Sequence, residues 1–205
     1  MLKGKLNVAV LVSGGGTNLQ AILDYEKAGK LTHGKIKAVI SSKAGVYALE
    51  RAKKSSVNSY VVSKKDCKSQ SEFEKGITDI LVKEDISVIV LAGFMSILSK
   101  DFTDRYKDRI INVHPSLIPS FCGEGYYGLR VHQAALDKGV KVTGATVHFV
   151  NEIADGGKII MQKAVKIKDG DTPEILQRRV MEQAEWKILP QSLELVCKNL
   201  LKGEN

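Results

Sequence analysis

Short apolar runs alternate with longer amphipathic stretches along nearly the whole chain, and this alternation constrains the fold more than any other feature. Residues 7–12 and 87–91 carry almost no polar side chain, which is typical of strands covered on both faces. Residues 18–28 and 71–84 instead repeat apolar side chains with helical spacing. The alternation predicts an α/β fold with a Rossmann-like, mostly parallel twisted sheet and helices on both of its faces.

The remaining elements follow the same pattern until the last third of the chain. Further strands are predicted at residues 36–40, 59–62, 109–113, 143–150 and 158–165, and further helices at 47–55, 99–106 and 129–137. The last two strands form a closing pair with no helix between them. We therefore expect an antiparallel portion at the C-terminal end of the sheet.

The last helix has clear boundaries in the sequence. Thr172 is a suitable N-cap, and Pro173 suits the first helical position. The helical pattern continues to about Cys197, and we expect an interruption at Pro190 because proline lacks the N–H of the helical hydrogen bond. Before this helix, residues 115–128 form an irregular segment rich in Pro, Gly and aromatic side chains. A loop of that length inside a compact domain is usually functional or mobile.

Length and composition limit the class of protein. A chain of 205 residues that is 43% hydrophobic predicts a single domain spanning residues 1–205. The apolar run at residues 8–12 is shorter than the roughly 7–15 residues of a secretory signal, and no run approaches the roughly 18 residues of a membrane span. Three cysteines far apart in sequence offer no zinc or redox pair. We expect a soluble, cytoplasmic protein without a metal site or a membrane contact.

The net charge favours anionic partners. The formal charge is +8 at pH 7, which suits phosphates, carboxylates or RNA. The lysines are spread along the chain, whereas a nucleic-acid footprint usually concentrates on one face. We therefore expect small-molecule substrates and consider a nucleic-acid partner unlikely. The sequence leaves open whether the protein is a monomer or a homodimer.

A glycine-rich segment at residues 13–18, Ser-Gly-Gly-Gly-Thr-Asn, lies between a predicted strand and a predicted helix. Glycines let the backbone approach an anion closely, and the free amides of a helix start favour a phosphate. The segment predicts phosphate binding by Gly15, Gly16, Thr17 and Asn18, with a purely structural tight turn as the alternative. A nicotinamide dinucleotide is disfavoured, because the second strand ends in Ser-Ser-Lys at residues 41–43 rather than in the ribose-binding acid.

The segment Asn-Val-His-Pro-Ser-Leu-Ile-Pro at residues 112–119 follows another predicted strand. Side chains alternate along a strand, so Asn112 and His114 should point to the same side. Ligand sites of open α/β sheets lie at such strand ends. An amide donor beside an imidazole, followed by a loop fixed by two prolines, predicts a catalytic role for both residues.

A third segment runs through residues 144–157 and ends in Asp-Gly-Gly. Taken alone, Asp155 and the two glycines favour a turn. His148, within the preceding predicted strand, is taken as a packing or hydrogen-bonding residue rather than a catalyst. These interpretations change when the three segments are considered together.

The three segments, in this order, resemble the glycinamide ribonucleotide formyltransferase family. A fourth stretch, Leu-Ala-Gly-Phe-Met-Ser-Ile-Leu at residues 91–98, looks like the strand and loop that line the folate pocket in that family. The likeness extends from residue 7 to about residue 190, nearly the whole chain. It implies the formyltransferase fold, with a phosphate-binding N-terminal half and a folate-binding C-terminal half.

The resemblance also implies roles for particular residues. Asn112, His114 and Asp155 would form a catalytic trio, and Glu185 would bind the ribose of the substrate. The phosphate would lie against Gly15, Gly16, Thr17 and Asn18. The folate-binding residues would be Phe94, Met95, Ser96, Ile97 and Leu98, together with Asn112 and Asp155.

Three positions depart from the family pattern. Ser96 stands where many relatives carry arginine, which would otherwise contact the acidic tail of the folate. Residues 121–128, Phe-Cys-Gly-Glu-Gly-Tyr-Tyr-Gly, replace a shorter loop that contains proline, and Ala154 precedes the aspartate where an aliphatic residue is usual. The first change bears on the contacts of the folate tail and the second on how the loop closes, and we expect neither to touch the trio.

The implied reaction moves a formyl group from 10-formyltetrahydrofolate, the cosubstrate, to the amine of glycinamide ribonucleotide without a metal. Asn112 and a protonated His114 would donate hydrogen bonds to the oxyanion of the tetrahedral species. Asp155 would raise the pKa of His114 by stabilising the imidazolium and would accept the proton of the amine.

The sequence alone leaves three alternative functions open. A methionyl-tRNA formyltransferase would use the same trio, but that family adds a C-terminal tRNA-binding domain, whereas only about 15 residues follow Pro190 here. A 10-formyltetrahydrofolate hydrolase would usually carry an extra N-terminal regulatory domain. A nucleotide-binding module without catalysis would need the glycine-rich segment alone.

Overall fold

The computed structural model describes residues 4–203, and within this range the strands form one sheet of seven in the order β3-β2-β1-β4-β5-β6-β7. The strands are β1 (Leu6–Val12), β2 (Gly34–Ser41), β3 (Asn58–Val61), β4 (Val88–Leu91), β5 (Ile110–His114), β6 (Val142–Phe149) and β7 (Ile159–Lys166). The first five pair in parallel, whereas β6 pairs antiparallel with both β5 and β7. The predicted mixed sheet, mostly parallel with an antiparallel C-terminal portion, is confirmed.

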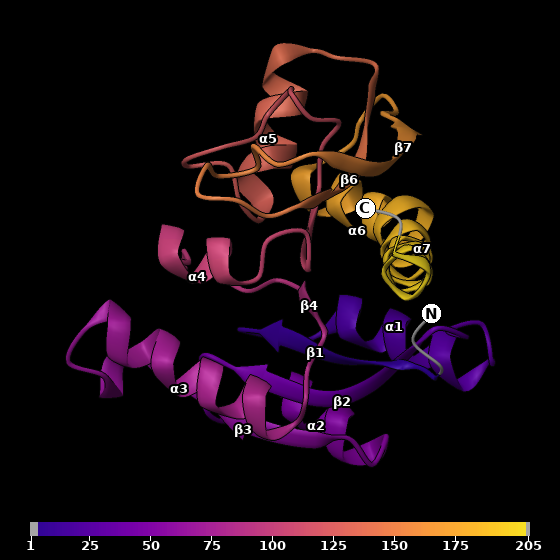
Figure 1. Cartoon of the computed structure of the whole chain (residues 1–205). Helices are drawn as coiled ribbons and strands as arrows, with labels where there is room; N and C mark the ends of the chain where they lie inside the picture. The colour runs from indigo at the N-terminus through magenta and orange to yellow at the C-terminus, as the bar shows by residue number, and fades with distance from the viewer. Residues whose placement is uncertain (1–3, 204–205) are drawn as a thin grey trace.

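The helices occupy the predicted positions with ends shifted by one or two residues, except that the last helix continues five residues beyond the predicted end at Cys197. They are α1 (Thr17–Lys27), α2 (Tyr47–Lys54), α3 (Gln70–Lys83), α4 (Lys100–Arg105), α5 (Leu129–Lys138), α6 (Pro173–Val180) and α7 (Trp186–Lys202), with a short 3₁₀ turn η1 (Lys64–Asp66). Figure 1 shows the N-terminal elements, in indigo and magenta, below the C-terminal elements, in orange and yellow. No helix over residues 4–203 combines the length and apolar character that crossing a membrane requires.

The two faces of the sheet bury separate apolar clusters. Because side chains alternate along a strand, Val8 and Val10 point to one face and Ala9 and Leu11 to the other. Helices α1, α2, α6 and α7 cover the first face, and α3 and α4 cover the second. This double coverage explains why β1 and β4 carry almost no polar side chains, as the apolar runs predicted.

The last helical segment is interrupted, but not where the sequence predicted. Thr172 caps α6 by accepting a hydrogen bond from the N–H of Ile175, and Pro173 takes the first position, as expected. The interruption is a π-helical turn, η2 (Met181–Glu185), whereas Pro190 lies inside the regular helix α7. The prediction of a break at Pro190 is therefore wrong. Pro190 removes only the hydrogen bond to the carbonyl of Trp186, and the buried helix continues past it; sequence periodicity gives no sign of the wide turn upstream.

The sheet brings the ends of three central strands together. Chain order runs outward from β1 through β2 and β3 on one side, and through β4 and β5 on the other, so the topological switch point lies between β1 and β4. In an open α/β sheet the crevice outside the carboxyl ends of the strands at this point binds ligands. Leu11, Leu91 and Asn112 lie in one row across β1, β4 and β5. The loops that follow these residues are therefore neighbours.

Candidate active site

The sheet register brings Asn112, His114 and His148 to one face. Asn112 and His114 are two residues apart on β5, and His148 lies directly opposite Asn112 on the antiparallel strand β6. Directly opposed residues of an antiparallel pair project to the same side. The Asn112 Nδ2 atom lies 3.3 Å from His148 Nε2. The predicted convergence of Asn112 and His114 is thus present, and His148 joins them.

Asp155 reaches both imidazoles from the loop between β6 and β7. Its Oδ2 lies 3.3 Å from His114 Nδ1, and its Oδ1 lies 3.4 Å from His148 Nε2. The carboxylate is 12% exposed, and the two imidazole side chains are only 5% and 2% exposed. The three residues predicted as a trio therefore meet in one poorly hydrated cluster, although they lie far apart in sequence.

The Asp-Gly-Gly sequence forms the tight turn that aims this carboxylate. Asp155 itself adopts a left-handed backbone with φ of 55°, a conformation that aspartate tolerates better than most residues. A Cβ at Gly157 would lie 1.8 Å from the carbonyl oxygen of Phe149, so only glycine fits there. The motif therefore forms a turn, as its sequence indicates, and the same turn brings the Asp155 carboxylate to the two imidazoles.

The unusual loop at residues 121–128 contacts the trio, so the expectation that it would leave the trio untouched is wrong. His114 Nε2 donates to the carbonyl oxygen of Phe121 at 2.8 Å, and the N–H of Gly123 donates to Asp155 Oδ2 at 2.9 Å. A carbonyl oxygen can only accept, so Nε2 carries the proton of a neutral His114. Its Nδ1 then presents a lone pair toward the carboxylate, and the gap between them can hold one additional proton.

The electrostatics of His114 differ from the sequence-based expectation. Burial lowers the pKa of His114 below its ordinary value of 6.5, and the opposing attraction of Asp155 does not reverse that shift. Asp155 does act to raise this pKa, as expected, but desolvation outweighs the ion pair, so the protonated His114 expected from the sequence is not favoured in the free site. Burial alone would raise the pKa of Asp155, but hydrogen bonds from His148 and Gly123 and the charge of His114 lower it. The free site accordingly favours a neutral imidazole beside a carboxylate.

The glycine-rich segment forms the turn between β1 and α1. Gly16 is the N-cap of α1, with a left-handed φ of 72°, and Thr17 is the first helical residue. A Cβ at Gly16 would lie 2.7 Å from the Cβ of Ala48, so α2 packs directly against this turn. The first N–H groups of a helix have no partner within it, and here Gly15 lies exposed at that helix start. An anion can approach these amides.

Glu185 lies beside the predicted phosphate residues. The Asn18 Nδ2 atom donates to Glu185 Oε2 at 2.7 Å, although the two residues are 167 positions apart. The Oδ1 atom of Asn18 is buried without a hydrogen-bond partner among residues 4–203. Burial raises the pKa of Glu185 to about 7, even though the bond from Asn18 opposes this shift. The predicted ribose-binding residue is therefore brought to the predicted phosphate site.

The predicted folate-lining segment follows β4 and has two kinds of residue. Met95 and Ile97 are 56% and 77% exposed, which leaves large apolar side chains available to a ligand. Leu98 is buried in the cluster under α3 and α4, and Phe94 stacks against Phe73 there with ring centroids 6.3 Å apart. A ligand contact from Leu98 would have to come from its backbone. Ser96 is half-buried between the two exposed residues.

Ser13 connects this segment to the glycine-rich turn. The Met95 N–H donates to Ser13 Oγ at 3.0 Å, and the Ser13 and Ser42 hydroxyl oxygens are 2.6 Å apart. These bonds join the loops that follow β1, β2 and β4. The predicted phosphate site and the predicted folate-lining segment are therefore held in one network at the edge of the sheet.

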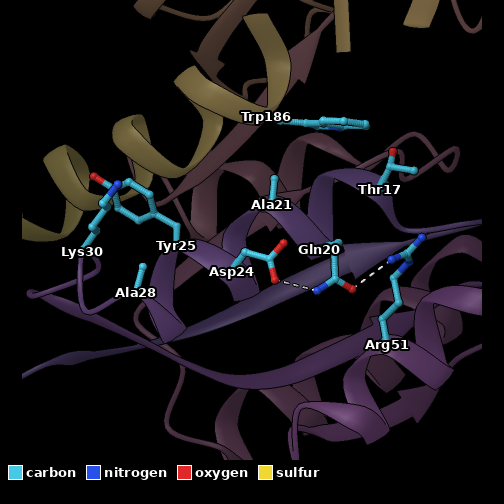
Figure 2. Close-up of a pocket in the computed structure, with 9 residues that line it drawn as sticks. All are labelled: Thr17, Gln20, Ala21, Asp24, Tyr25, Ala28, Lys30, Arg51 and Trp186. Atoms are coloured by element: carbon cyan, nitrogen blue, oxygen red, sulfur yellow. Dashed lines mark hydrogen bonds between the residues drawn. The ribbon is translucent and has the colours of Figure 1, made fainter. Parts of the chain in front are cut away.

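A cleft of about 410 Å³ runs along α1 (Figure 2). Its lining includes Thr17, Gln20 and Asp24 on one side of α1, Arg51 of α2 and Trp186 of α7. Only Thr17 among the predicted site residues lines it, and no member of the trio does. Across residues 4–203 no group of three or more His, Cys, Asp or Glu side chains is arranged to hold a metal ion.

Sequence reasoning missed the groups that orient the predicted residues. The Phe121 carbonyl and the Gly123 amide are backbone groups, which carry no signature in a sequence. The bridging position of His148 could have been inferred by aligning the two predicted strands, since it faces Asn112. The hydroxyl of Ser13 could not have been assigned, because its partner Met95 lies on a different loop.

Comparison with known proteins places the chain in a family. The profile of the family described as formyl transferase matches residues 6–193. The phosphoribosylglycinamide formyltransferase of Haemophilus influenzae is 43% identical over 183 residues, which cover 89% of this chain and 83% of that protein. The human trifunctional purine biosynthetic protein adenosine-3 is 43% identical over 99% of this chain, but the chain spans only 20% of that longer protein.

Solved structures agree with this placement. The glycinamide ribonucleotide transformylase 1 of Symbiobacterium toebii matches with a TM-score of 0.89 and 37% identity, over 97% of this chain and 90% of that chain. The phosphoribosylglycinamide formyltransferase of Brucella melitensis matches with a TM-score of 0.87 and 38% identity, over 95% and 96% of the two chains. Sequence and structure therefore agree that this chain belongs to the formyl transferase family.

Proposed function

We propose that this chain transfers the formyl group of 10-formyltetrahydrofolate to the amine of glycinamide ribonucleotide. The products are N-formylglycinamide ribonucleotide and tetrahydrofolate, and the step belongs to de novo purine biosynthesis. The relatives named phosphoribosylglycinamide formyltransferase support this assignment. In this proposal residues 1–205 act as one formyltransferase domain, whose N-terminal half holds the phosphate and whose C-terminal half holds the folate.

The proposal rests on one observation, the lateral distance between the glycine-rich turn and the trio. Leu11, which precedes the turn, and Asn112 lie in one row of the sheet and are separated by the single strand β4. Neighbouring strands are about 4.8 Å apart, so this separation is about 10 Å. A small acceptor with a phosphate at one end and an amine at the other fits that span.

The acceptor side has groups for each part of such a molecule. The backbone amides of Gly15, Gly16, Thr17 and Asn18 would hold the phosphate. The carboxylate of Glu185 would accept hydrogen bonds from ribose hydroxyls, and the unpartnered Oδ1 of Asn18 is suited to accept another. A buried polar atom without a partner is costly, so a ligand hydroxyl at this position would be favourable.

The cluster around Asp155 has the groups that formyl transfer needs. When the amine nitrogen attacks the formyl carbon, negative charge develops on the formyl oxygen. The side-chain amide of Asn112 would donate to this oxygen, and one preorganised donor of this kind lowers the barrier by about 3–4 kcal/mol. The poor hydration of the cluster strengthens such a bond.

The proton of the amine would move to the gap between His114 Nδ1 and Asp155 Oδ2. A neutral His114 that donates from Nε2 to Phe121 leaves Nδ1 free to accept it. The bond from the formyl carbon to the folate nitrogen then breaks, and the proton passes to that nitrogen. The atoms balance without a covalent enzyme intermediate, and alignment of the two substrates supplies roughly 7–11 kcal/mol.

The donor would lie along the loop after β4. Exposed Met95 and Ile97 offer apolar surface to the pterin end of the folate, and Phe94, Ser96 and Leu98 would contribute mainly through the backbone. Asn112 and Asp155 would meet the formyl-bearing part. This donor assignment and the cytoplasmic location remain predictions, as does the choice between a monomer and a homodimer.

A direct acceptor assay tests the proposal. The purified protein is incubated with 10-formyltetrahydrofolate and either glycinamide ribonucleotide, methionyl-tRNA or water alone, and tetrahydrofolate release is followed. We expect turnover with glycinamide ribonucleotide at least a hundredfold above the other two. Preferred formylation of methionyl-tRNA would support the tRNA enzyme, and release without an acceptor would support the hydrolase. Nucleotide binding without any turnover would support a non-catalytic module.

A further inference from the structure

We propose that Arg51, on α2, positions the glycine-rich turn so that its amides face the substrate phosphate. This inference rests on the proposed function, because it concerns the same phosphate site. Arg51 Nε donates to the carbonyl oxygen of Gly15 at 2.9 Å. One turn earlier on α2, the N–H of Ala48 donates to the carbonyl oxygen of Gly14 at 3.2 Å. Helix α2 therefore binds two successive carbonyls of the turn.

These two carbonyl contacts also fix the direction of the N–H groups that follow them, because of the geometry of the peptide bond. In a trans peptide the C=O of one residue and the N–H of the next lie in one plane and point in opposite directions. When the carbonyls of Gly14 and Gly15 point toward α2, the amides of Gly15 and Gly16 must point away from it. Successive amides that point the same way form an anion-binding concavity. Arg51 thus determines the direction of an N–H group that it does not touch.

Arg51 is itself held by its neighbours on the wall of the cleft. Its Nη1 donates to Gln20 Oε1 at 2.9 Å, and Gln20 Nε2 donates to Asp24 Oδ1 at 2.9 Å. Figure 2 shows this row of side chains leading from Asp24 along α1 to Arg51. The guanidinium also lies 4.8 Å from the centre of the Tyr47 ring. A guanidinium fixed on three sides can direct a hydrogen bond that a mobile side chain could not.

The charge of Arg51 adds to this effect. Among residues 4–203 no carboxylate lies within ion-pair distance of it, since Asp24 is reached only through Gln20. The positive charge next to the turn is therefore not cancelled by a direct partner. A phosphate bound by the amides would lie in this field, which favours its dianionic form.

The inference is tested with Arg51→Gln, Arg51→Lys and a matched control, Arg105→Gln. Arg105 also lies near a tyrosine ring, 5.7 Å from Tyr106, but it is on α4. We expect Arg51→Gln to raise the KM for glycinamide ribonucleotide at least tenfold, with kcat and the KM for the folate changed less than twofold. Arg51→Lys keeps the charge but cannot donate to Gly15 and Gln20 together, so its KM should be intermediate. Arg105→Gln should match the parent.

A binding measurement separates failure of this inference from failure of the proposed function. Ribose 5-phosphate is titrated into the parent and the variants by calorimetry, with ribose as the control, and thermal unfolding is recorded for each protein. We expect Arg51→Gln to bind ribose 5-phosphate at least tenfold more weakly than the parent, whether or not the acceptor assay succeeds. Equal affinity in Arg51→Gln, or a lowered melting temperature with unchanged affinity and KM, would overturn the positioning role.

Discussion

The glycine-rich turn and the cluster around Asp155 are built in opposite ways. The turn uses backbone amides of consecutive residues at the start of α1 and is supported from behind by α2. The cluster uses side chains from β5, β6 and the loop between β6 and β7, and each contact crosses a long sequence separation. One region therefore depends on local conformation, and the other depends on the register of the whole sheet.

The two regions also differ in hydration. Gly15 and Thr17 lie exposed to solvent, which suits an anion that arrives with its water. His114 and His148 are almost fully buried, so the polar groups there interact at a low effective dielectric. We infer that the turn contributes mainly to binding and the cluster mainly to the rate of the chemical step. Substitutions in either region test this division, because each should change either substrate binding or the chemical rate.

The largest effect is expected in the cluster. Asn112→Ala removes the oxyanion donor, and Asp155→Ala removes one side of the proton site, so each should lower kcat by about a hundredfold or more. The KM for glycinamide ribonucleotide should change little, because neither side chain belongs to the phosphate site. Steady-state kinetics with both substrates varied will measure this. A variant with near-normal kcat would show that the residue has no part in the reaction.

A large effect on binding is expected at Gly16. Gly16→Val should raise the KM for glycinamide ribonucleotide about tenfold or more, because the side chain would enter the space of Ala48 and would also have to adopt the left-handed backbone. Gly29→Val is the control. Gly29 has the same φ of 72° but no other heavy atom within 4 Å of an added Cβ. It should lose stability from backbone strain alone and keep its KM.

If the two glycine variants raise KM equally, general destabilisation rather than the turn would explain the effect. Thermal unfolding of both proteins, recorded beside the kinetics, provides this comparison. We expect Gly16→Val to be the less stable of the two, since overpacking adds about 1–3 kcal/mol to the strain that both share.

Glu185 shares one property with each region. It is buried, like the side chains of the cluster, and it lies at a proposed binding site, like the turn. Its folded-state pKa is raised to about 7 from an ordinary value of 4.5, so its contribution to stability is fully present below pH 4.5 and is lost as the pH rises through 7. Glu185→Gln should therefore be more stable than the parent at pH 8 by at most about 3 kcal/mol and equally stable near pH 4. Denaturant unfolding at the two pH values measures the difference.

The same substitution should weaken acceptor binding about tenfold at pH 8, where the carboxylate makes charge-assisted bonds to hydroxyls. A variant that gains stability and also keeps its KM would remove Glu185 from the substrate site. A variant that gains no stability at pH 8 would instead show that the carboxylate is better solvated than its burial indicates.

The smallest effect is expected at Ser13, which links the two substrate regions. Ser13→Ala removes the acceptor of the Met95 N–H, so the KM for the folate should rise about two- to tenfold, with a smaller change for the acceptor. Ser192→Ala is the control, since the Ser192 hydroxyl is buried without a partner among residues 4–203. Its removal should leave kinetics unchanged and stability unchanged or higher. An equal rise in both KM values for Ser13→Ala would place the hydroxyl in the acceptor site.

The comparison between the two regions also explains what the sequence could predict. Strand and helix positions and the glycine-rich turn were predictable because periodicity and local backbone chemistry determine them. The meeting of His114 with Asp155 followed only from resemblance to a family. Its electrostatic character could not be foreseen, because the pKa of His114 depends on how deeply the cluster is buried. The hydrogen bonds of the Phe121 carbonyl and the Gly123 amide could not be predicted for a different reason. Any residue has a backbone carbonyl and almost any has a backbone N–H, so residue type gives no sign of such a contact.

The wide turn at Met181–Glu185 has a consequence for how this chain can vary. A π turn contains one residue more than an α turn of the same rise, so it acts as a built-in insertion. Deleting one residue there would restore the regular ladder and keep α6 and α7 in phase, but it would remove the wide turn that sets the direction of Glu185. Asn18 would then lose its partner while the helix itself remained intact. We therefore expect a one-residue deletion in this turn to leave the fold intact and to break the hydrogen bond between Asn18 and Glu185.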